Sequence, residues 1–257
     1  MDRGSILAVI PARYASTRFP GKPLVPLLGV PMVAHVVARV REAGIVDEIV
    51  VATDDERIAA AARQAGATVA MTGEAASGTD RVAHVARDRA AAVVLNVQGD
   101  EPALPPENLR ALAEFLVTHP EIPMATLALP ARAGDLTDSN TVKVVCDRSG
   151  RALYFSRAPI PYPRNRSASP PLRHVGLYGF QRDALLELTS WPPVELEQVE
   201  ELEQLRALWY GMAIQIVAAA GESVAVDVPE DVPRAEAALR GRGIGEPSRA
   251  DSCTEDR

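Results

Sequence analysis

The sequence has few cysteines, few lysines and no long apolar run. Cys146 and Cys253 lie far apart in a chain of 257 residues and predict neither a disulfide framework nor a cysteine-rich zinc site. The apolar run at 5–10 is followed at once by Pro11 and Arg13, and no run reaches the length of a membrane span. The start also lacks the apolar core of a signal peptide. We therefore expect an intracellular, cytoplasmic protein without a membrane span.

The charge balance is acidic, with 27 basic and 34 acidic residues and a net charge of −7. Such a balance argues against a protein that coats nucleic acid or an anionic membrane. Of the basic residues 25 are arginines, and the two lysines are Lys22 and Lys143. A genome biased toward arginine codons accounts for most of this skew, but it does not account for the two lysines.

The first half of the chain alternates short apolar runs with helical patterns. Strands are expected at 5–10, 48–52, 67–71 and 93–97, and helices at 31–42, 80–89 and 106–117. This alternation predicts an α/β fold with a mainly parallel sheet and right-handed crossovers. Ligands of such sheets bind beyond the carboxyl ends of the strands.

The second half is less regular. Strands are expected at 124–129, 142–146, 173–180 and 213–219, with a strong helix over 197–210 and a short one over 229–240. The proline- and arginine-rich loop 156–171 is either a lid over an anionic substrate or a solvated connection. The tail, 241–257, has almost no aliphatic residues and is expected to be disordered.

The loop after the first strand, 11–23, combines cations with small residues. Arg13, Arg18 and Lys22 suit an extended polyphosphate, whereas the alternative is an ordinary basic surface loop. It is not a P-loop, because Ser16 and Pro23 stand where that motif needs glycine and Ser or Thr.

Two acidic positions are candidate metal ligands. Asp100 follows the strand at 93–97, and its carboxylate either binds Mg²⁺ or belongs to an acidic turn that caps the next helix. Asp227 is a second candidate ligand, although its spacing from Pro229 favours a helix N-cap.

Six motifs together resemble the 3-deoxy-manno-octulosonate cytidylyltransferase family, also called CMP-Kdo synthetases, over roughly 1–240. They are Ile-Pro-Ala-Arg through Gly-Lys-Pro-Leu at 10–24, Ser-Gly-Thr-Asp-Arg at 77–81, Asn-Val-Gln-Gly-Asp-Glu-Pro at 96–102, Ala-Leu-Tyr-Phe-Ser-Arg at 152–157, His-Val-Gly-Leu-Tyr-Gly at 174–179 and Leu-Glu-Gln-Leu-Arg at 202–206. Each is weak alone, but their order and separations match the family.

The resemblance assigns roles to the residues of these motifs. It implies that Arg13, Lys22 and Asp100 are catalytic, with Arg13 and Lys22 on the triphosphate, and that Asp100 and Asp227 bind Mg²⁺. The implied nucleotide site also contains Pro11, Ala12, Thr53, Asp54, Ser77, Gly78, Arg81 and Gln98. The implied sugar site consists of Gln98, Arg157, His174, Tyr178, Glu203 and Gln204. Val228 departs from the family pattern, which has threonine there.

The resemblance also implies a fold and a reaction. The fold is a mixed, mainly parallel sheet flanked by helices, of the Rossmann-like nucleotide-diphospho-sugar transferase type, with a smaller dimerisation and sugar-binding lobe. One domain would span 1–240, with a nucleotide half at about 1–120 and a sugar half at about 121–240. The reaction is CTP + Kdo → CMP-Kdo + diphosphate, for lipopolysaccharide synthesis, by a homodimer. The alternatives are a cytidylyltransferase for amino-Kdo or sialic acid, and a non-catalytic nucleotide-binding relative.

Overall fold

The computed structural model describes residues 4–15, 19–132, 134–164 and 171–241. Within them, one sheet contains nine strands: β1 (Ile6–Ala12), β4 (Glu48–Thr53), β5 (Thr68–Met71), β6 (Val93–Asn96), β7 (Met124–Pro130), β8 (Lys143–Cys146), β9 (Ala152–Ser156), β10 (Leu172–Gln181) and β11 (Ile214–Ala218). A separate hairpin is formed by β2 (Pro26–Leu27) and β3 (Val30–Pro31).

The main path of the sheet has the order β11-β7-β10-β6-β1-β4-β5, with β8 and β9 attached beside β10. β1 pairs in parallel with β4 and β6, β4 pairs in parallel with β5, and β7 pairs in parallel with β11. β10 runs antiparallel to β6, β7 and β8. β8 also pairs antiparallel with β9. The predicted α/β fold with a mixed, mostly parallel sheet is therefore confirmed, and the antiparallel pairs lie at β10 and in the β8–β9 pair attached to it.

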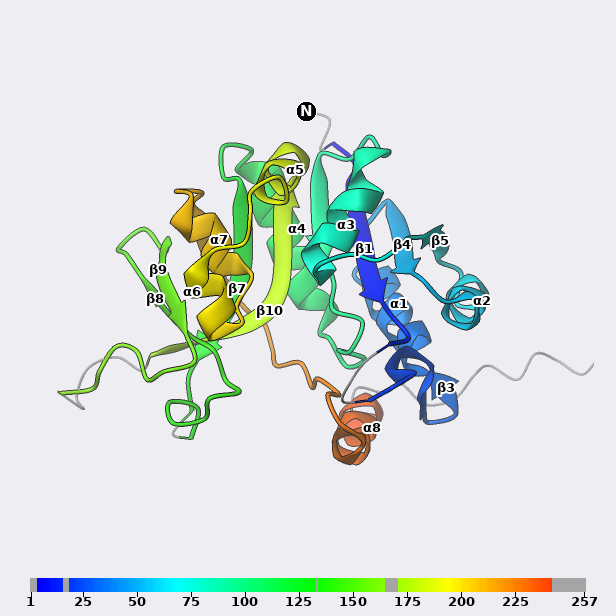
Figure 1. Ribbon diagram of the computed structural model, residues 1–257. Coiled ribbons are helices and arrows are strands. Elements are labelled where there is room, and N and C mark those ends of the chain that lie inside the picture. Colours follow the sequence, from blue (N-terminus) through cyan, green and yellow to red (C-terminus); the bar gives the residue numbers. More distant parts are fainter. Residues whose placement is uncertain (1–3, 16–18, 133, 165–170, 242–257) are drawn as a thin grey trace, which may run out of the picture.

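Helices cover both faces of the sheet. They are α1 (Met32–Glu42), α2 (Glu56–Gln64), α3 (Gly78–Arg87), α4 (Pro106–Thr118), α5 (Arg182–Leu188), α6 (Glu195–Glu200), α7 (Gln204–Trp209) and α8 (Val232–Gly241), with 3-10 turns η1 (Lys22–Leu24) and η2 (Pro229–Asp231). In Figure 1, α3 and α5 lie in front of the sheet, α1 and α4 lie behind it, and α8 lies beyond the strand end at which β1 points. No helix among the described residues is long and apolar enough to cross a membrane.

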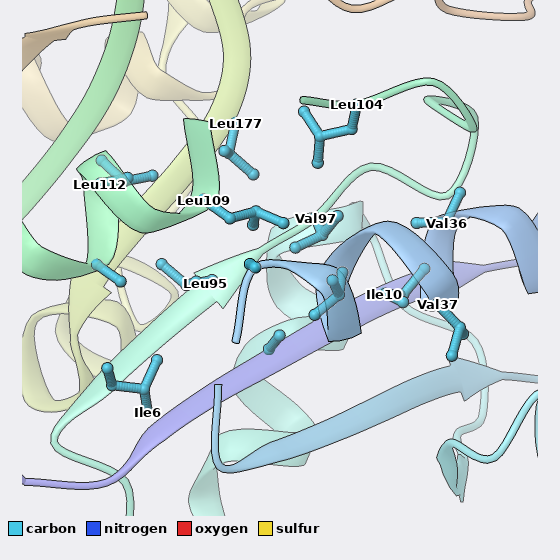
Figure 2. Packing of buried hydrophobic residues seen from close by; sticks show 14 of the residues in the cluster. Ile6, Ile10, Val36, Val37, Leu95, Val97, Leu104, Leu109, Leu112 and Leu177 are labelled. Atoms are coloured by element: carbon cyan, nitrogen blue, oxygen red, sulfur yellow. The ribbon is translucent and has the colours of Figure 1, made fainter. Parts of the chain in front are cut away.

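The larger cores fill the space between the sheet and these helices. On the α1 and α4 face, Leu109 and Leu112 of α4 and Val36 of α1 pack toward Leu95 of β6 and Ile10 of β1 (Figure 2). A second cluster joins α3, α5 and α7 to the opposite face and to β8 and β9. Both faces of β1 and β6 are buried by these clusters. This burial explains why the sequence is continuously apolar in these strands and does not alternate with polar residues.

A third, smaller cluster joins α8 to the β2–β3 hairpin and to the start of α1. Ala235 and Leu239 of α8 pack with Leu27 of the hairpin, Met32 and Val226. The backbone N–H of Val226 also donates to the carbonyl of Asp100 at 2.9 Å. The segment before α8 is thus fixed beside the loop that follows β6.

The predicted helix over 197–210 is wrong. The chain forms α6 and then α7, and Glu201 between them has the left-handed φ of 52°. Two short elements, β9 with 5 residues and α5 with 7, were not predicted from the sequence.

The two predicted halves share the sheet, since β10 of the second half pairs with β6 of the first. Gly241 ends α8, and the rest of the predicted tail, 242–257, lies outside the described residues. Residues 165–170 of the predicted lid loop also lie outside them.

Candidate active site

A cavity of about 510 Å³ opens at the carboxyl ends of β1 and β6. It brings together the predicted residues Pro11, Ala12, Arg13, Lys22, Ser77, Gly78, Arg81, Gln98, Asp100, Tyr178, Glu203, Gln204 and Asp227. Thr53, Asp54, Arg157 and His174 are the predicted residues that do not line it. The site lies where a parallel sheet is expected to bind ligands.

Lys22 lies between two carboxylates from distant parts of the chain. Its Nζ is 2.8 Å from Oδ2 of Asp100 and 3.5 Å from Oδ1 of Asp227. Gly99 lets the loop that carries Asp100 approach β1, because a Cβ at this position would lie 2.7 Å from the carbonyl oxygen of Pro11. Arg13 is exposed on the same cavity. The cavity thus has cations beside a pair of acids.

Asp227 does not cap the helix that follows it, so the N-cap interpretation is wrong. The 3-10 turn η2 begins after Val228, and the backbone N–H groups of Asp227 and Val228 both donate to Oδ2 of Asp231, at 2.9 and 3.2 Å. The Asp231 carboxylate holds this turn although residue 228 has no hydroxyl. The Asp227 carboxylate is directed at Lys22 instead.

The donor set fits a magnesium ion. Mg²⁺ binds through one or two carboxylates and completes its octahedral shell with water and substrate phosphate oxygens. Asp100 and Asp227 supply two carboxylates around one point, while no group of three or more His, Cys, Asp or Glu among the described residues forms a ready protein cage. In this structure Lys22 forms ion pairs with both acids.

Glu101 lies next to this acidic pair. Burial, together with the negative charges of Asp100 and Asp227, raises the pKa of Glu101 to about 7. The carboxyl group of Glu101 therefore keeps its proton to a higher pH than the carboxyl group of an exposed glutamate.

Arg81 is held in place from behind the cavity wall. Its guanidinium donates to Oδ2 of Asp54 at 3.1 Å and to the hydroxyl of Thr72. Thr53 is fully buried, and its carbonyl accepts the backbone N–H of Thr72 at 2.8 Å. Asp54 and Thr53 therefore contact Arg81 and its support rather than the cavity.

A chain of hydrogen bonds links the nucleotide side of the cavity to the opposite wall. Gln98 donates to Asn96 at 3.4 Å, Asn96 donates to the Thr79 hydroxyl at 3.3 Å, and Thr79 donates to Oε2 of Glu203 at 2.5 Å. Thr79 and Asn96 were not assigned a role from the sequence, although both lie within the motifs at 77–81 and 96–102.

The opposite wall ends in a buried amide. The phenol of Tyr178 donates to Oε1 of Gln204 at 3.0 Å, and burial raises the pKa of Tyr178. The buried Nε2 of Gln204 has no hydrogen-bond partner among the described residues. Because buried polar groups are normally paired, this amide has a donor available for a further acceptor.

Arg157 lies behind this wall. Its Nε donates to the carbonyl of Glu200 at 2.7 Å and its Nη1 to the carbonyl of Ser139 at 3.1 Å. Nη2 donates to the carbonyl of Glu201 at 3.4 Å. In this structure the guanidinium caps the carboxyl end of α6.

His174 also lies behind the wall, where its ring contacts Phe155 and Tyr178. Desolvation lowers the pKa of His174 to about 3. Its Nε2 is 2.8 Å from the hydroxyl of Thr126, which donates its own proton to the carbonyl of Leu177 at 2.8 Å. The Thr126 oxygen therefore accepts from His174, and the neutral ring carries its proton on Nε2.

Further residues line the cavity without having been predicted: Pro23, Ala75, Ala76, Thr79, Asn96, Gly99, Gly176, Glu201 and Leu202. Most are small or apolar, and their side chains give no chemical signal in a single sequence. The four from 201 to 204 enter the cavity because the chain turns at Glu201.

Comparisons with known proteins agree on one group. The chain matches a family model described as Cytidylyltransferase over residues 7–214. The 3-deoxy-manno-octulosonate cytidylyltransferase of Syntrophotalea carbinolica is 48% identical over 248 residues, which cover 92% of this chain and 99% of that protein. The protein of the same name from Anaeromyxobacter sp. (strain Fw109-5) is 49% identical over 237 residues, covering 91% and 96%.

Solved structures give the same result. A structure of CMP:2-keto-3-deoxy-manno-octonic acid synthetase complexed with CTP has a TM-score of 0.88 and 39% identity, covering 93% of this chain and 99% of that one. The 4-diphosphocytidyl-2C-methyl-D-erythritol synthase of Anaerococcus prevotii, at 15% identity and a TM-score of 0.64, covers 93% and 100% and shares the fold.

The environment of His174 predicts that its ring stays neutral between about pH 5 and 8, where an unperturbed histidine titrates. The physical reason is desolvation, which lowers the pKa of His174 to about 3. Two-dimensional ¹H–¹⁵N NMR of the imidazole, assigned with a His174→Gln variant, should show a pH-independent Nε2–H tautomer. A titration midpoint inside this range, or the Nδ1–H tautomer, would contradict the burial argument.

Proposed function

The chain belongs to the 3-deoxy-manno-octulosonate cytidylyltransferase family, and on this premise we propose that it transfers a cytidylyl group from CTP to 3-deoxy-D-manno-octulosonate (Kdo) and releases diphosphate. The observation that carries the proposal is Lys22 between Asp100 and Asp227 on one side of the cavity. Across the cavity, the unpaired amide of Gln204 suits a polyhydroxylated sugar.

The reaction requires in-line attack by the anomeric hydroxyl of Kdo on the α-phosphorus of CTP. No residue needs to form a covalent intermediate, so the protein acts by positioning and by neutralising charge. Arg13 and Lys22 bind the triphosphate oxygens, and the Lys22 ammonium stabilises the negative charge that develops on the leaving diphosphate. Ser77, at the N-terminus of α3, and Arg81 lie on the cytidine side.

Asp100 and Asp227 would hold Mg²⁺ when it is present, since both carboxylates are directed at the same point. The ion would neutralise phosphate charge and orient the triphosphate. Lys22 would then be released from the carboxylates and become available to the phosphates.

Tyr178, Glu203 and Gln204 lie on the sugar side of the cavity. Glu203 and the Gln204 carbonyl accept hydrogen bonds, while the Gln204 amide donates, so together they match hydroxyl groups, which do both. Kdo is a building block of bacterial lipopolysaccharide, and we place the reaction in that biosynthesis. CTP is a cytoplasmic nucleotide, which makes the cytoplasm the proposed compartment.

The proposed activity predicts that purified protein releases diphosphate from CTP only when Kdo and Mg²⁺ are both supplied. Coupled detection of diphosphate would measure it, with sialic acid and 8-amino-Kdo in parallel reactions and with EDTA as the metal-removal arm. Turnover of sialic acid or amino-Kdo without turnover of Kdo would reject the assigned sugar. Full activity in EDTA would reject the metal.

Asp100→Asn should lower kcat by about a hundredfold or more without unfolding the protein, since the neutral amide removes one of two carboxylates from the cation site. Steady-state kinetics at several Mg²⁺ concentrations would measure this effect. Asp183→Asn is the matched control, because Asp183 is 94% exposed and follows β10 at the opposite end of the sheet. Near-normal kcat in Asp100→Asn would remove Asp100 from the catalytic set.

We also propose that the protein is a homodimer. Large apolar side chains are exposed on neighbouring elements of the second half: Leu153 of β9, Val199 of α6, and Trp209 and Tyr210 at the end of α7, which are 60%, 75%, 57% and 40% exposed. The ring of Trp191 stacks on Tyr210 at 4.7 Å. Apolar surface of this kind favours a protein interface, and a second copy of the chain would cover it.

Trp209→Asp should convert the dimer to a monomer, because an unpaired carboxylate in an apolar interface is strongly unfavourable. Sedimentation velocity would measure the mass. Met71→Asp serves as control, because Met71 is also exposed but lies on β5 at the other edge of the sheet. An unchanged mass in Trp209→Asp would place the interface elsewhere.

A further inference from the structure

Lys143, the second lysine of the chain, is completely buried at the start of β8. Its Nζ donates to three backbone carbonyls: Asp138 at 2.9 Å, Thr141 at 2.6 Å and Arg157 at 2.5 Å. An ammonium group has three N–H bonds, so all of its donors are used. Burial lowers the pKa of Lys143, and the nearby carboxylates of Asp138 and Glu200 oppose that shift.

The three carbonyls explain why this position needs a lysine in a chain rich in arginine. They converge on one nitrogen from two segments, the loop before β8 and the residue after β9, and a tetrahedral ammonium can direct its three protons to them. A guanidinium spreads its donors over three nitrogens in one plane. An arginine at position 143 would satisfy fewer of these carbonyls and would need space that the buried site lacks.

The contact with Arg157 connects Lys143 to the cavity. Lys143 fixes the backbone carbonyl of Arg157, and the Arg157 side chain binds the last carbonyls of α6. Glu200 at the end of α6 also contacts the end of β9: its carboxylate accepts hydrogen bonds from the Ser156 hydroxyl at 2.6 Å and from the Arg157 backbone N–H at 2.9 Å. The end of β9 and the end of α6 are thus joined by charge-assisted hydrogen bonds.

The contacts between the end of β9 and the end of α6 lie just before the residues that line the sugar side of the cavity. Directly after Glu200, the chain turns at Glu201 with a φ of 52°, and the next residues, Glu203 and Gln204, line the cavity. A non-glycine residue in the left-handed region is costly, so its neighbours must hold it there. Arg157 does this by binding carbonyls on both sides of the turn, those of Glu200 and Glu201.

We propose that Lys143 is a positioning residue for sugar binding: its ammonium anchors Arg157, and Arg157 with Glu200 fixes the turn that places Glu203 and Gln204. The inference rests on the proposed Kdo-dependent activity. Lys143 itself does not line the cavity. Removal of the Lys143 side chain should therefore weaken binding of the sugar. Binding of the nucleotide should stay unchanged, because its site is built from β1, α3 and the loop after β6.

The kinetic test compares Lys143→Met, Lys143→Arg and Glu200→Ala with the wild-type protein. We expect the KM for Kdo to rise by about tenfold or more in both Lys143 variants, with the KM for CTP and the Kd for CTP within about twofold. Glu200→Ala, which keeps Lys143 and its three carbonyl contacts, should show the same selectivity with a smaller rise. If a Lys143 variant does not fold, Glu200→Ala still tests the contacts between the end of β9 and the end of α6, and an unchanged KM for Kdo in this variant would overturn the proposal.

Arg182→Met is the matched control. Arg182 also donates to backbone carbonyls, those of Ala86 at 2.9 Å and Arg87 at 2.8 Å, but it lies at the opposite end of the sheet. This variant should lose thermal stability and keep both KM values. An unchanged Kdo KM in folded Lys143→Met, or an equal rise for both substrates, would overturn the proposal. Full recovery of Kdo binding in Lys143→Arg would show that charge alone suffices and would also contradict it.

Hydrogen–deuterium exchange supplies a readout that does not depend on the substrate. In Lys143→Met the amides of Thr141, Arg157 and Leu202, which are hydrogen-bonded in the wild-type structure, should exchange faster, while those of α5 stay unchanged. Arg182→Met should give the reverse pattern. Unchanged exchange at Leu202 would overturn the link, whereas wild-type protein that fails to use Kdo would reject only the proposed function.

Discussion

The ion pairs of Lys22 are the contacts on which the arrangement of the cavity depends. Asp100 lies on the loop after β6 and Asp227 on the segment before α8, and both are within 3.5 Å of the Lys22 nitrogen. Two like charges this close repel each other unless a cation lies between them. The lysine therefore allows two segments that are more than 120 residues apart in the sequence to lie side by side without a ligand. The hydrogen bond from the Val226 backbone N–H to the Asp100 carbonyl fixes their relative position. The small core under α8 stabilises the segment before this helix, and Asp227 of that segment lines the cavity.

The sheet explains why the cavity has two chemically different sides. β1, β4, β5 and β6 are parallel, so their carboxyl ends meet at one edge and bring the loops with Arg13, Lys22 and Asp100 together. β10 enters antiparallel beside β6 and places Tyr178 opposite Asn96. The proposed polyphosphate site is thus built from loops at strand ends, and the proposed site for sugar hydroxyl groups is built from a strand side chain and the α6–α7 turn. This division follows from strand direction and agrees with a reaction that joins a nucleotide to a sugar.

Sequence patterns predicted the features that depend on local composition. Apolar runs at 5–10 and 93–97 mark strands buried on both faces, and cations or acids directly after them mark the edge where ligands bind. The break in the helix predicted at 197–210 could not be found in this way, because every residue there suits a helix. The break is stabilised by Arg157, which is 43 positions before Glu200 in the sequence and acts on backbone carbonyls. The motifs of the resemblance contained Arg157 and His174, but only the structure shows that both lie behind the cavity wall.

The two lysines perform comparable tasks in different surroundings. Lys22 faces carboxylate oxygens at the cavity and Lys143 faces carbonyl oxygens in the interior, and in both places oxygens from separate segments converge on a single nitrogen. A planar guanidinium suits two oxygens of one carboxylate, as in the buried pair of Arg206 with Glu197. Oxygens that approach one point from several directions require a compact cation with tetrahedral donors. Codon bias can fill surface positions with arginine at little energetic cost, but at these two positions the geometry of the acceptors favours lysine.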